Sequence, residues 1–145
     1  MTASAHPTRL EAAQRFLMRI GRAEIDQAVE LLSPSVTYRV LGNHALAGTF
    51  SGAEEVRKHL INLDDRTLGT FNATKWEDWL VGEDHVAALA NISMLAEGQL
   101  MTMRHLFLIK FDVADMIVGI TVFAEDQSAA LRFFGPAGAR RGRTP

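Results

Sequence analysis

The sequence predicts one α+β domain in which helices come first and a long antiparallel sheet follows. The 145 residues are 48% apolar and 22% charged, which is enough for one hydrophobic core and too little chain for two full domains. Apolar residues recur at helical spacing in the first half of the chain. From Phe71 onward they occur instead in β-favouring runs that turn residues separate. Helices followed by strands are typical of α+β folds.

The first predicted helix runs from Thr8 to Gly21, and a shorter one covers residues 24–32. Thr8 and Glu11 have the spacing of a capping box, in which side chains satisfy two free backbone N–H groups. Gly21 is a typical residue to follow a helix end. The apolar side of the first helix consists of Leu10, Ala13, Phe16, Leu17 and Ile20.

A short strand is expected over 36–40 and a turn over 42–44. Ser51 and Glu54 form a second capping-box pattern, and the helix that they open carries Val56, Leu60 and Ile61. Four strands follow, and the pattern allows a short helix over 126–134. Because residues 135–145 contain no core-forming side chains, we expect a basic, disordered tail and a domain over 8–134. The four strands are expected at 71–81, 85–96, 99–111 and 116–124.

The composition excludes several classes of function. The 15 basic and 17 acidic residues give a formal net charge of −2, which argues against a nucleic-acid partner. The absence of cysteine excludes disulfides and thiolate catalysis. The longest apolar stretch, 116–124, is much shorter than the roughly 20 residues that span a bilayer, and no hydrophobic signal core begins the chain. We therefore expect a cytoplasmic protein that does not bind membranes.

No metal or cofactor is expected from the sequence. The five histidines show no paired spacing of the kind that binds zinc, and no acidic loop of the calcium-binding kind is present. The glycine-containing segment 48–52 lacks the lysine of a phosphate-binding loop.

The pairing of the strands 85–96 and 99–111 indicates which side chains share a face. A two-residue turn at 97–98 pairs Ala96 with Gln99. The side chains on one face are then apolar and either small or flexible, except for a single imidazole. The methionines among them can adapt to ligands of varied apolar shape. A ligand pocket and a helix-packed core both fit this pattern. The face consists of Ala88, Ala90, Ile92, Met94, Met101, Met103, His105 and Phe107.

The opposite face carries leucines between polar residues. If Leu89, Leu95, Leu100 and Leu106 were exposed, they would form a sizeable apolar strip. The sequence therefore predicts a homodimer.

The order of these elements resembles a known superfamily. The segments that carry the resemblance are 36–40, 46–52 leading into 54–56, 81–86, 104–107 and 117–126. Over about residues 8–134 the chain resembles the nuclear transport factor 2-like superfamily, and within it the SnoaL-like branch of polyketide cyclases and relatives of ketosteroid isomerase and limonene epoxide hydrolase. The resemblance implies a cone-shaped fold with a curved antiparallel sheet packed on N-terminal helices around a pocket.

The catalytic residues of these relatives are not carried over. The general base of ketosteroid isomerase relatives corresponds to Tyr38, their helix tyrosine to Phe16, and their second oxyanion acid to a position near Phe107. The epoxide hydrolase relatives need an Asp–Arg–Asp arrangement, but here Arg104 has no matching aspartate. The resemblance therefore implies neither of these two reactions, and any mechanism must use this chain's own polar groups.

His105 and Tyr38 are the candidate catalytic residues. An imidazole on an apolar face can act as a general base, and burial lowers its pKa so that it stays neutral; a structural histidine bonded to a carbonyl is the alternative. Tyr38, the only tyrosine, can donate to a substrate carbonyl or serve as an aromatic wall. The candidate substrate-binding residues are Phe16, His44, Trp76, Trp79, Ala90, Ile92, Met94, Met101, Met103 and Phe107.

The register near the tryptophans decides whether His105 has an acidic partner. Pairing through the turn at Gly82 places Trp79 and Glu77 on the Ala88 face and Trp76 and Asp78 on the other, whereas a bulge would swap them. Glu77 or Asp78 could then partner His105, or remain a solvated rim carboxylate.

Two functions fit the sequence. The leading hypothesis is a cofactor-independent enzyme of the SnoaL-like kind, which catalyses a proton-transfer reaction (cyclisation, isomerisation or dehydration) on an apolar, carbonyl-bearing or polycyclic small molecule. The alternative is a non-catalytic ligand-binding or dimerisation module of the same fold.

Overall fold

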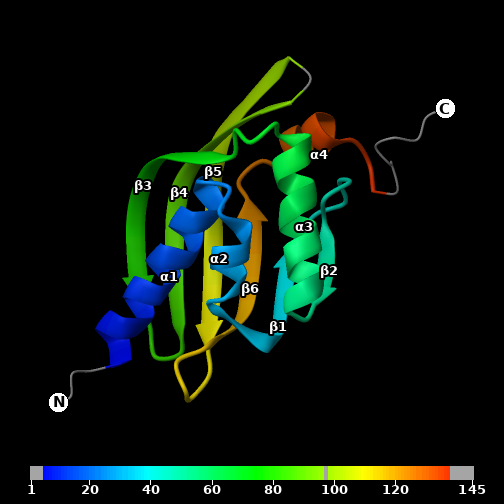
Figure 1. The fold of residues 1–145 in the computed structure, drawn as a ribbon. Helices are drawn as coiled ribbons and strands as arrows, with labels where there is room; N and C mark the ends of the chain where they lie inside the picture. Colours follow the sequence, from blue (N-terminus) through cyan, green and yellow to red (C-terminus); the bar gives the residue numbers. More distant parts are fainter. Residues whose placement is uncertain (1–4, 97, 138–145) are drawn as a thin grey trace.

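The computed structural model describes residues 5–96 and 98–137, which form one curved sheet with helices packed against it (Figure 1). The elements follow the predicted order of helices and then strands, and this confirms the α+β class. In chain order they are α1 (Ala5–Gly21), α2 (Ile25–Val29), β1 (Leu32–Val40), β2 (Gly48–Ser51), α3 (Ala53–Arg66), β3 (Asn72–Val81), β4 (His85–Ala96), β5 (Gln99–Phe111), β6 (Ile117–Ala124) and α4 (Gln127–Phe134).

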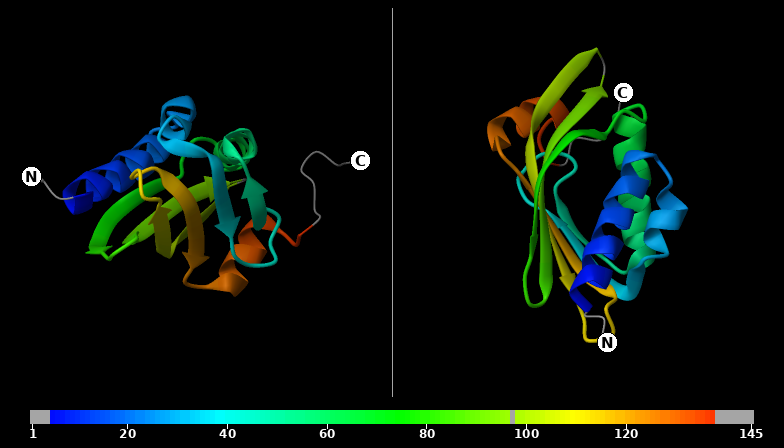
Figure 2. Two further views of the ribbon diagram at one scale, coloured as in Figure 1. Left: turned by 90° about the horizontal axis from the view of Figure 1, so that it is seen from below. Right: turned by 90° about the vertical axis from the view of Figure 1, so that its left-hand side faces the viewer.

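The six strands lie in the order β2-β1-β6-β5-β4-β3. Neighbouring strands are antiparallel except β1 and β6, which run parallel. The sheet curves without closing, and α1, α2 and α3 lie together on its inner face (Figure 2). The apolar sides of these helices and the inner face of the sheet form the core, as predicted for a curved sheet packed on N-terminal helices.

The predicted register of β4 and β5 is confirmed along the whole hairpin. Ala88 pairs with Phe107 and Ala90 with His105, and β5 alternates strictly between buried and more exposed residues from Met101 to Phe111. His105 therefore lies on the inner face, because the side-chain period of a strand is two residues.

The register of β3 differs from simple alternation because of two irregularities, one between Ala73 and Lys75 and one between Trp76 and Asp78. The second is the bulge that would swap side chains between faces. Trp76 pairs with Ala90 and Trp79 with Ala88, so both indoles lie on the inner side with their ring centroids 4.9 Å apart. Of the two alternatives the bulge is the one observed, and it brings Trp76 to the inner face instead of the outer face that an unbroken register would give it.

Neither predicted capping box begins a helix. Helix α1 begins at Ala5, three residues before Thr8. Helix α3 has Gly52 as its N-cap, with a φ of 90° and no side-chain cap hydrogen bond, because Ser51 is the last residue of β2 and pairs with Thr37. The C-terminal helix is observed, and its N-cap Asp126 accepts a hydrogen bond from the Ala129 N–H.

The end of the chain takes part in the fold further than expected. The Ala45 N–H donates to the Gly135 carbonyl and the Ala137 N–H donates to the Asn43 carbonyl, which ties residues 135–137 to the loop after β1. The rest of the basic tail, 138–145, lies outside the described residues.

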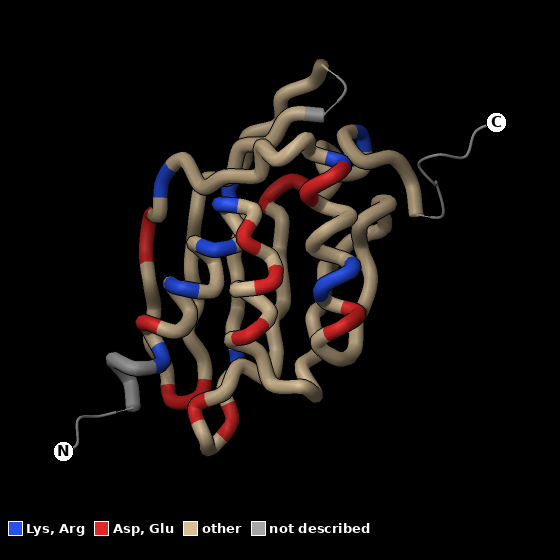
Figure 3. The backbone as a smooth tube through the Cα atoms, in the orientation of Figure 1, with Lys and Arg blue, Asp and Glu red and all other residues tan. Residues whose placement is uncertain are grey.

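Arg9 holds the narrow end of the structure together. Acidic residues gather in the two lower turns, β3–β4 and β5–β6 (Figure 3). The Arg9 guanidinium lies 2.7 Å from the Asp115 carboxylate and donates to the carbonyls of Glu83 and Asp112. It also lies over the ring of Phe111. These charge-assisted bonds fix α1 against both turns.

Candidate functional site

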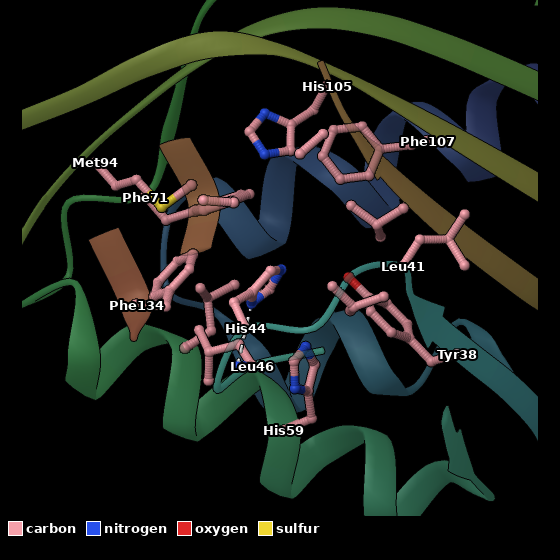
Figure 4. A pocket seen from close by; sticks show the side chains of 15 residues that line it. Tyr38, Leu41, His44, Leu46, His59, Phe71, Met94, His105, Phe107 and Phe134 are labelled. Carbon is pink, nitrogen blue, oxygen red and sulfur yellow. Dashed lines mark hydrogen bonds between the residues drawn. The ribbon is translucent and has the colours of Figure 1, made fainter. Parts of the chain in front are cut away.

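A mostly apolar cavity of about 40 Å³ lies between the sheet, α3, α4 and the loop after β1. Four polar side chains face it, each from a different element: Tyr38 from β1, His44 from the loop, His59 from α3 and His105 from β5 (Figure 4). We call this the histidine cavity. A few convergent polar groups on apolar walls are typical of small-molecule sites.

Tyr38 is buried on the inner face of β1, and its hydroxyl points into the cavity (Figure 4). Among the described residues no hydrogen bond forms with this hydroxyl. Burial raises the pKa of Tyr38 far above its usual value because desolvation penalises the phenolate. The side chain is therefore a neutral hydrogen-bond donor that a ligand oxygen could use.

His105 is buried beside Phe107, and its Nδ1 lies 3.4 Å from the carbonyl oxygen of Met103. Because a carbonyl can only accept, this contact favours the tautomer with hydrogen on Nδ1 and a free lone pair on Nε2. Burial lowers the pKa of His105 to about 4. The imidazole is therefore neutral at pH 7 and can accept a proton.

His44 is held by its own turn. The Leu46 N–H donates to its Nδ1 at 3.2 Å, so the neutral ring carries hydrogen on Nε2. Its ring also packs against Phe134 at 5.2 Å between centroids. Burial, together with the charge of Arg66, lowers the pKa of His44.

His59 is a cavity residue that the sequence analysis missed. Its ring stacks on that of Phe50, with 4.2 Å between the ring centroids, and its centroid lies 5.3 Å from that of the Tyr38 ring. Burial and the nearby His44 lower its pKa to about 4. The signal was available, because His59 is three residues after Val56 and one before Leu60, on the apolar side of a helix.

The structure brings together only part of the predicted site. His44, Met94, His105, Phe107 and Tyr38 all line the histidine cavity. Trp76 and Ile92 line a second cavity instead, which Phe107 shares. The other predicted binding residues line neither of these two cavities, since they pack in the core or along the sheet; they are Phe16, Trp79, Ala90, Met101 and Met103.

The structure does not support an acidic partner for His105 on β3. Glu77 lies 3.8 Å from Arg104, which also pairs with Glu125 at 2.8 Å on the outer face of the sheet. Asp78 is exposed and its carboxylate accepts from the Trp79 N–H. Of the two alternatives, the solvated rim carboxylate is the one observed, because the bulge after Trp76 turns both carboxylates away from the inner face.

Within the described part of the chain, no three histidine or carboxylate side chains form a group that could hold a metal ion. None of the described helices is long and apolar enough to cross a membrane.

Solved structures share this architecture over almost their whole length. Bal32a, from a soil-derived mobile gene cassette, aligns with a TM-score of 0.83 at 17% identity, covering 90% of this chain and 99% of that one. A nuclear transport factor 2-like protein from Burkholderia xenovorans LB400 aligns with a TM-score of 0.76 at 13% identity, covering 88% and 95%. The chain has the nuclear transport factor 2-like fold. No protein-family model and no curated protein matches it.

A third structure with this fold is described as a SnoaL-like polyketide cyclase, from Jannaschia sp. CCS1. It aligns with a TM-score of 0.75 at 13% identity, covering 94% of this chain and 98% of that one. The resemblance to the nuclear transport factor 2-like superfamily is thus confirmed for the fold. Identities this low establish no reaction, so the chemistry has to be argued from the histidine cavity.

Proposed function

We propose that this protein is a cofactor-independent enzyme that moves a proton on an apolar, carbonyl-bearing small molecule. The observation that carries the proposal is that one largely apolar cavity holds both a neutral imidazole with a free lone pair and a tyrosine hydroxyl that has no hydrogen bond among the described residues. The SnoaL-like polyketide cyclase among the similar structures supports a substrate of this kind.

In the proposed reaction, His105 removes a proton from the carbon next to the substrate carbonyl. The C–H bond breaks, the proton goes to Nε2, and the electron pair moves onto the carbonyl oxygen. The Tyr38 hydroxyl donates a hydrogen bond to that oxygen and stabilises its negative charge. The imidazolium then returns the proton to a different atom, which completes an isomerisation or allows ring closure.

The lowered pKa of His105 restricts the substrate. A base with a pKa of about 4 is weak, so it can remove a carbon-bound proton only when the enolate is well stabilised. The raised pKa of Tyr38 keeps that donor protonated over the whole physiological range, and the apolar walls strengthen its hydrogen bond by excluding water.

The test is exchange of carbon-bound hydrogen for deuterium in a panel of apolar cyclic ketones and 1,3-diketones, followed by NMR in D₂O. Replacing Tyr38 by phenylalanine should lower the exchange rate about 100-fold, because one oxyanion donor is lost while the ring next to His59 stays. Exchange at the wild-type rate in Tyr38→Phe would contradict the role of the hydroxyl.

A non-catalytic ligand-binding module is the second candidate. All three cavity histidines have partners that explain them structurally, since His44 accepts from Leu46, His59 stacks on Phe50 and the His105 Nδ1 lies 3.4 Å from the Met103 carbonyl oxygen. A protein that binds members of the same panel in calorimetry and exchanges no carbon-bound hydrogen in any of them would be such a module.

We also propose that a second copy of the chain covers the outer face of the sheet. Leu89, Leu106 and Phe123 are cross-strand neighbours there, and Leu100 at the hairpin end is 70% exposed. Burying such a strip is favourable. Sedimentation equilibrium at micromolar concentration should give twice the mass of one chain, and Leu106→Glu should give a folded monomer. A wild-type monomer would contradict the proposal.

A further inference from the structure

A second cavity of about 150 Å³ lies between the end of α1 and the start of β3. Phe71 and Phe107 line both this cavity and the histidine cavity. In Figure 4 both rings lie on the wall of the histidine cavity. The two cavities are therefore neighbours that two aromatic side chains separate.

The histidine cavity alone is too small for the proposed substrate. Its volume of about 40 Å³ is room for roughly three water molecules. Phe107 is in the middle of β5 and only 2% exposed, so its ring is fixed by packing. Phe71 precedes β3, in the connection from α3, and is half-buried. Phe71 is therefore the side chain that can move and join the two cavities.

Of the described residues that line the second cavity, Arg22 is the only charged one. It lies one helical turn after Met18, which lines the same cavity, just beyond the end of α1. Within the described residues its guanidinium forms no ion pair or hydrogen bond. Across from it the Asn72 amide oxygen lies 3.8 Å from the position that a Cβ atom would take at Gly21, so a guanidinium and an amide flank the same opening.

The remaining walls of the second cavity are mostly apolar. Trp76 and Ile92 contribute from the sheet, and Leu17 and Met18 from α1. A guanidinium matches a carboxylate by two parallel hydrogen bonds, and an amide N–H can donate a third. Such a site would hold the charged end of a ligand whose body is apolar.

We propose that the two cavities form one elongated site for an apolar carboxylate, with the carboxylate at Arg22 and Asn72 and the far end at His105 and Tyr38. Phe71 turns aside when the ligand binds. The placement of the ligand's reacting end at His105 and Tyr38 rests on the proposed function. The placement of its carboxylate end depends only on the second cavity.

The test compares decanoate with 1-decanol, which have the same chain and differ in the head group. Trp79→Phe leaves Trp76 as the only tryptophan, so that its fluorescence reports occupancy of the second cavity. In this background decanoate should bind about tenfold more tightly than decanol. Arg22→Gln should remove this preference by weakening the binding of decanoate while leaving the binding of decanol unchanged. Arg15→Gln, on the exposed side of the same helix, should leave it intact.

Equal affinity of the wild-type cavity for the two probes would overturn the inference. An equal loss of affinity for decanoate and decanol in Arg22→Gln would overturn it as well. Phe71→Leu, with its fold checked by circular dichroism, should strengthen decanoate binding several-fold because a smaller side chain moves aside more easily. Weaker binding in this folded variant would contradict the role of Phe71.

The two proposals can fail separately. Probe binding involves no reaction, so the preference for decanoate is expected whether or not the protein is an enzyme. If deuterium exchange is absent while the Arg22-dependent preference is present, the proposed reaction is wrong and the carboxylate site stands. If exchange occurs equally in Arg22→Gln and wild type for keto acids and neutral ketones, the reaction stands and the carboxylate site is wrong.

Discussion

Replacing His105 by alanine is expected to lower proton-transfer turnover by about 10²- to 10⁴-fold, the usual contribution of a general base. The expected loss is large because the Tyr38 hydroxyl stays protonated and cannot serve as the base, and because the His44 Nδ1 already accepts from the Leu46 N–H. The measurement is kcat/KM for deuterium exchange at pH 7. A matched control is His85→Ala, which removes a histidine at the first position of β4 and should leave turnover unchanged.

The pH profile separates a base from a structural histidine. Because burial lowers the pKa of His105 to about 4, nearly all of the protein already has His105 in its reactive neutral form at pH 7. Wild-type kcat/KM should therefore be flat from pH 6 to 8 and fall only as the pH approaches 4. An inflection near the ordinary histidine pKa of about 6.5, or turnover unchanged in a folded His105→Ala, would contradict the assignment.

Acidification is expected to destabilise the fold through its buried histidines. The pKa of His59 is about 4 in the folded state against about 6.5 in the unfolded chain, so the unfolded state binds more protons between these two values. The contribution of neutral His59 to the free energy of unfolding is therefore fully present above pH 6.5 and is lost as the pH falls towards 4. At about 1.36 kcal/mol for each pKa unit, His59 alone should contribute a loss of about 3 kcal/mol.

Urea unfolding by circular dichroism at pH 7.0, 5.5 and 4.5 measures this effect. His59→Phe can retain the stack with Phe50 and should reduce the pH dependence of the unfolding free energy by nearly one proton. His85→Gln, which replaces a histidine outside the cavity, is the matched control variant. Equal pH dependence in His59→Phe and wild type would show that His59 is protonated in the folded protein.

The architecture followed from the sequence where local signals were strong. The expected two-residue connection between Ala96 and Gln99 predicted the observed register of β4 and β5, since a two-residue hairpin and a buried inner face allow only one pairing. From that register the inward direction of His105 and Met94 followed directly. The parallel pairing of β1 with β6 had no such signal, because it joins segments far apart in the chain.

The candidate site was predictable only in part, for the same reason. His44, Met94, His105 and Phe107 line the histidine cavity with Tyr38, but His59 was missed although it occupies the apolar side of α3. For the β3 carboxylates the sequence left two alternatives open, because a one-residue bulge changes the face of every residue beyond it. Arg22 and Phe71 carried no recognisable pattern, since their position beside a cavity depends on how α1 packs against β3.

The sequence by itself determined the α+β class, the β4–β5 hairpin, the absence of thiol chemistry and the neutral polar groups available for a reaction. These depend on periodicity, turn chemistry and residue type, which are local properties. Only the tertiary structure decided which of these groups meet. Four elements converge to place Tyr38 and three histidines around one small cavity, and two aromatic rings separate it from a second one. Such convergence depends on long-range packing, which no short stretch of sequence encodes.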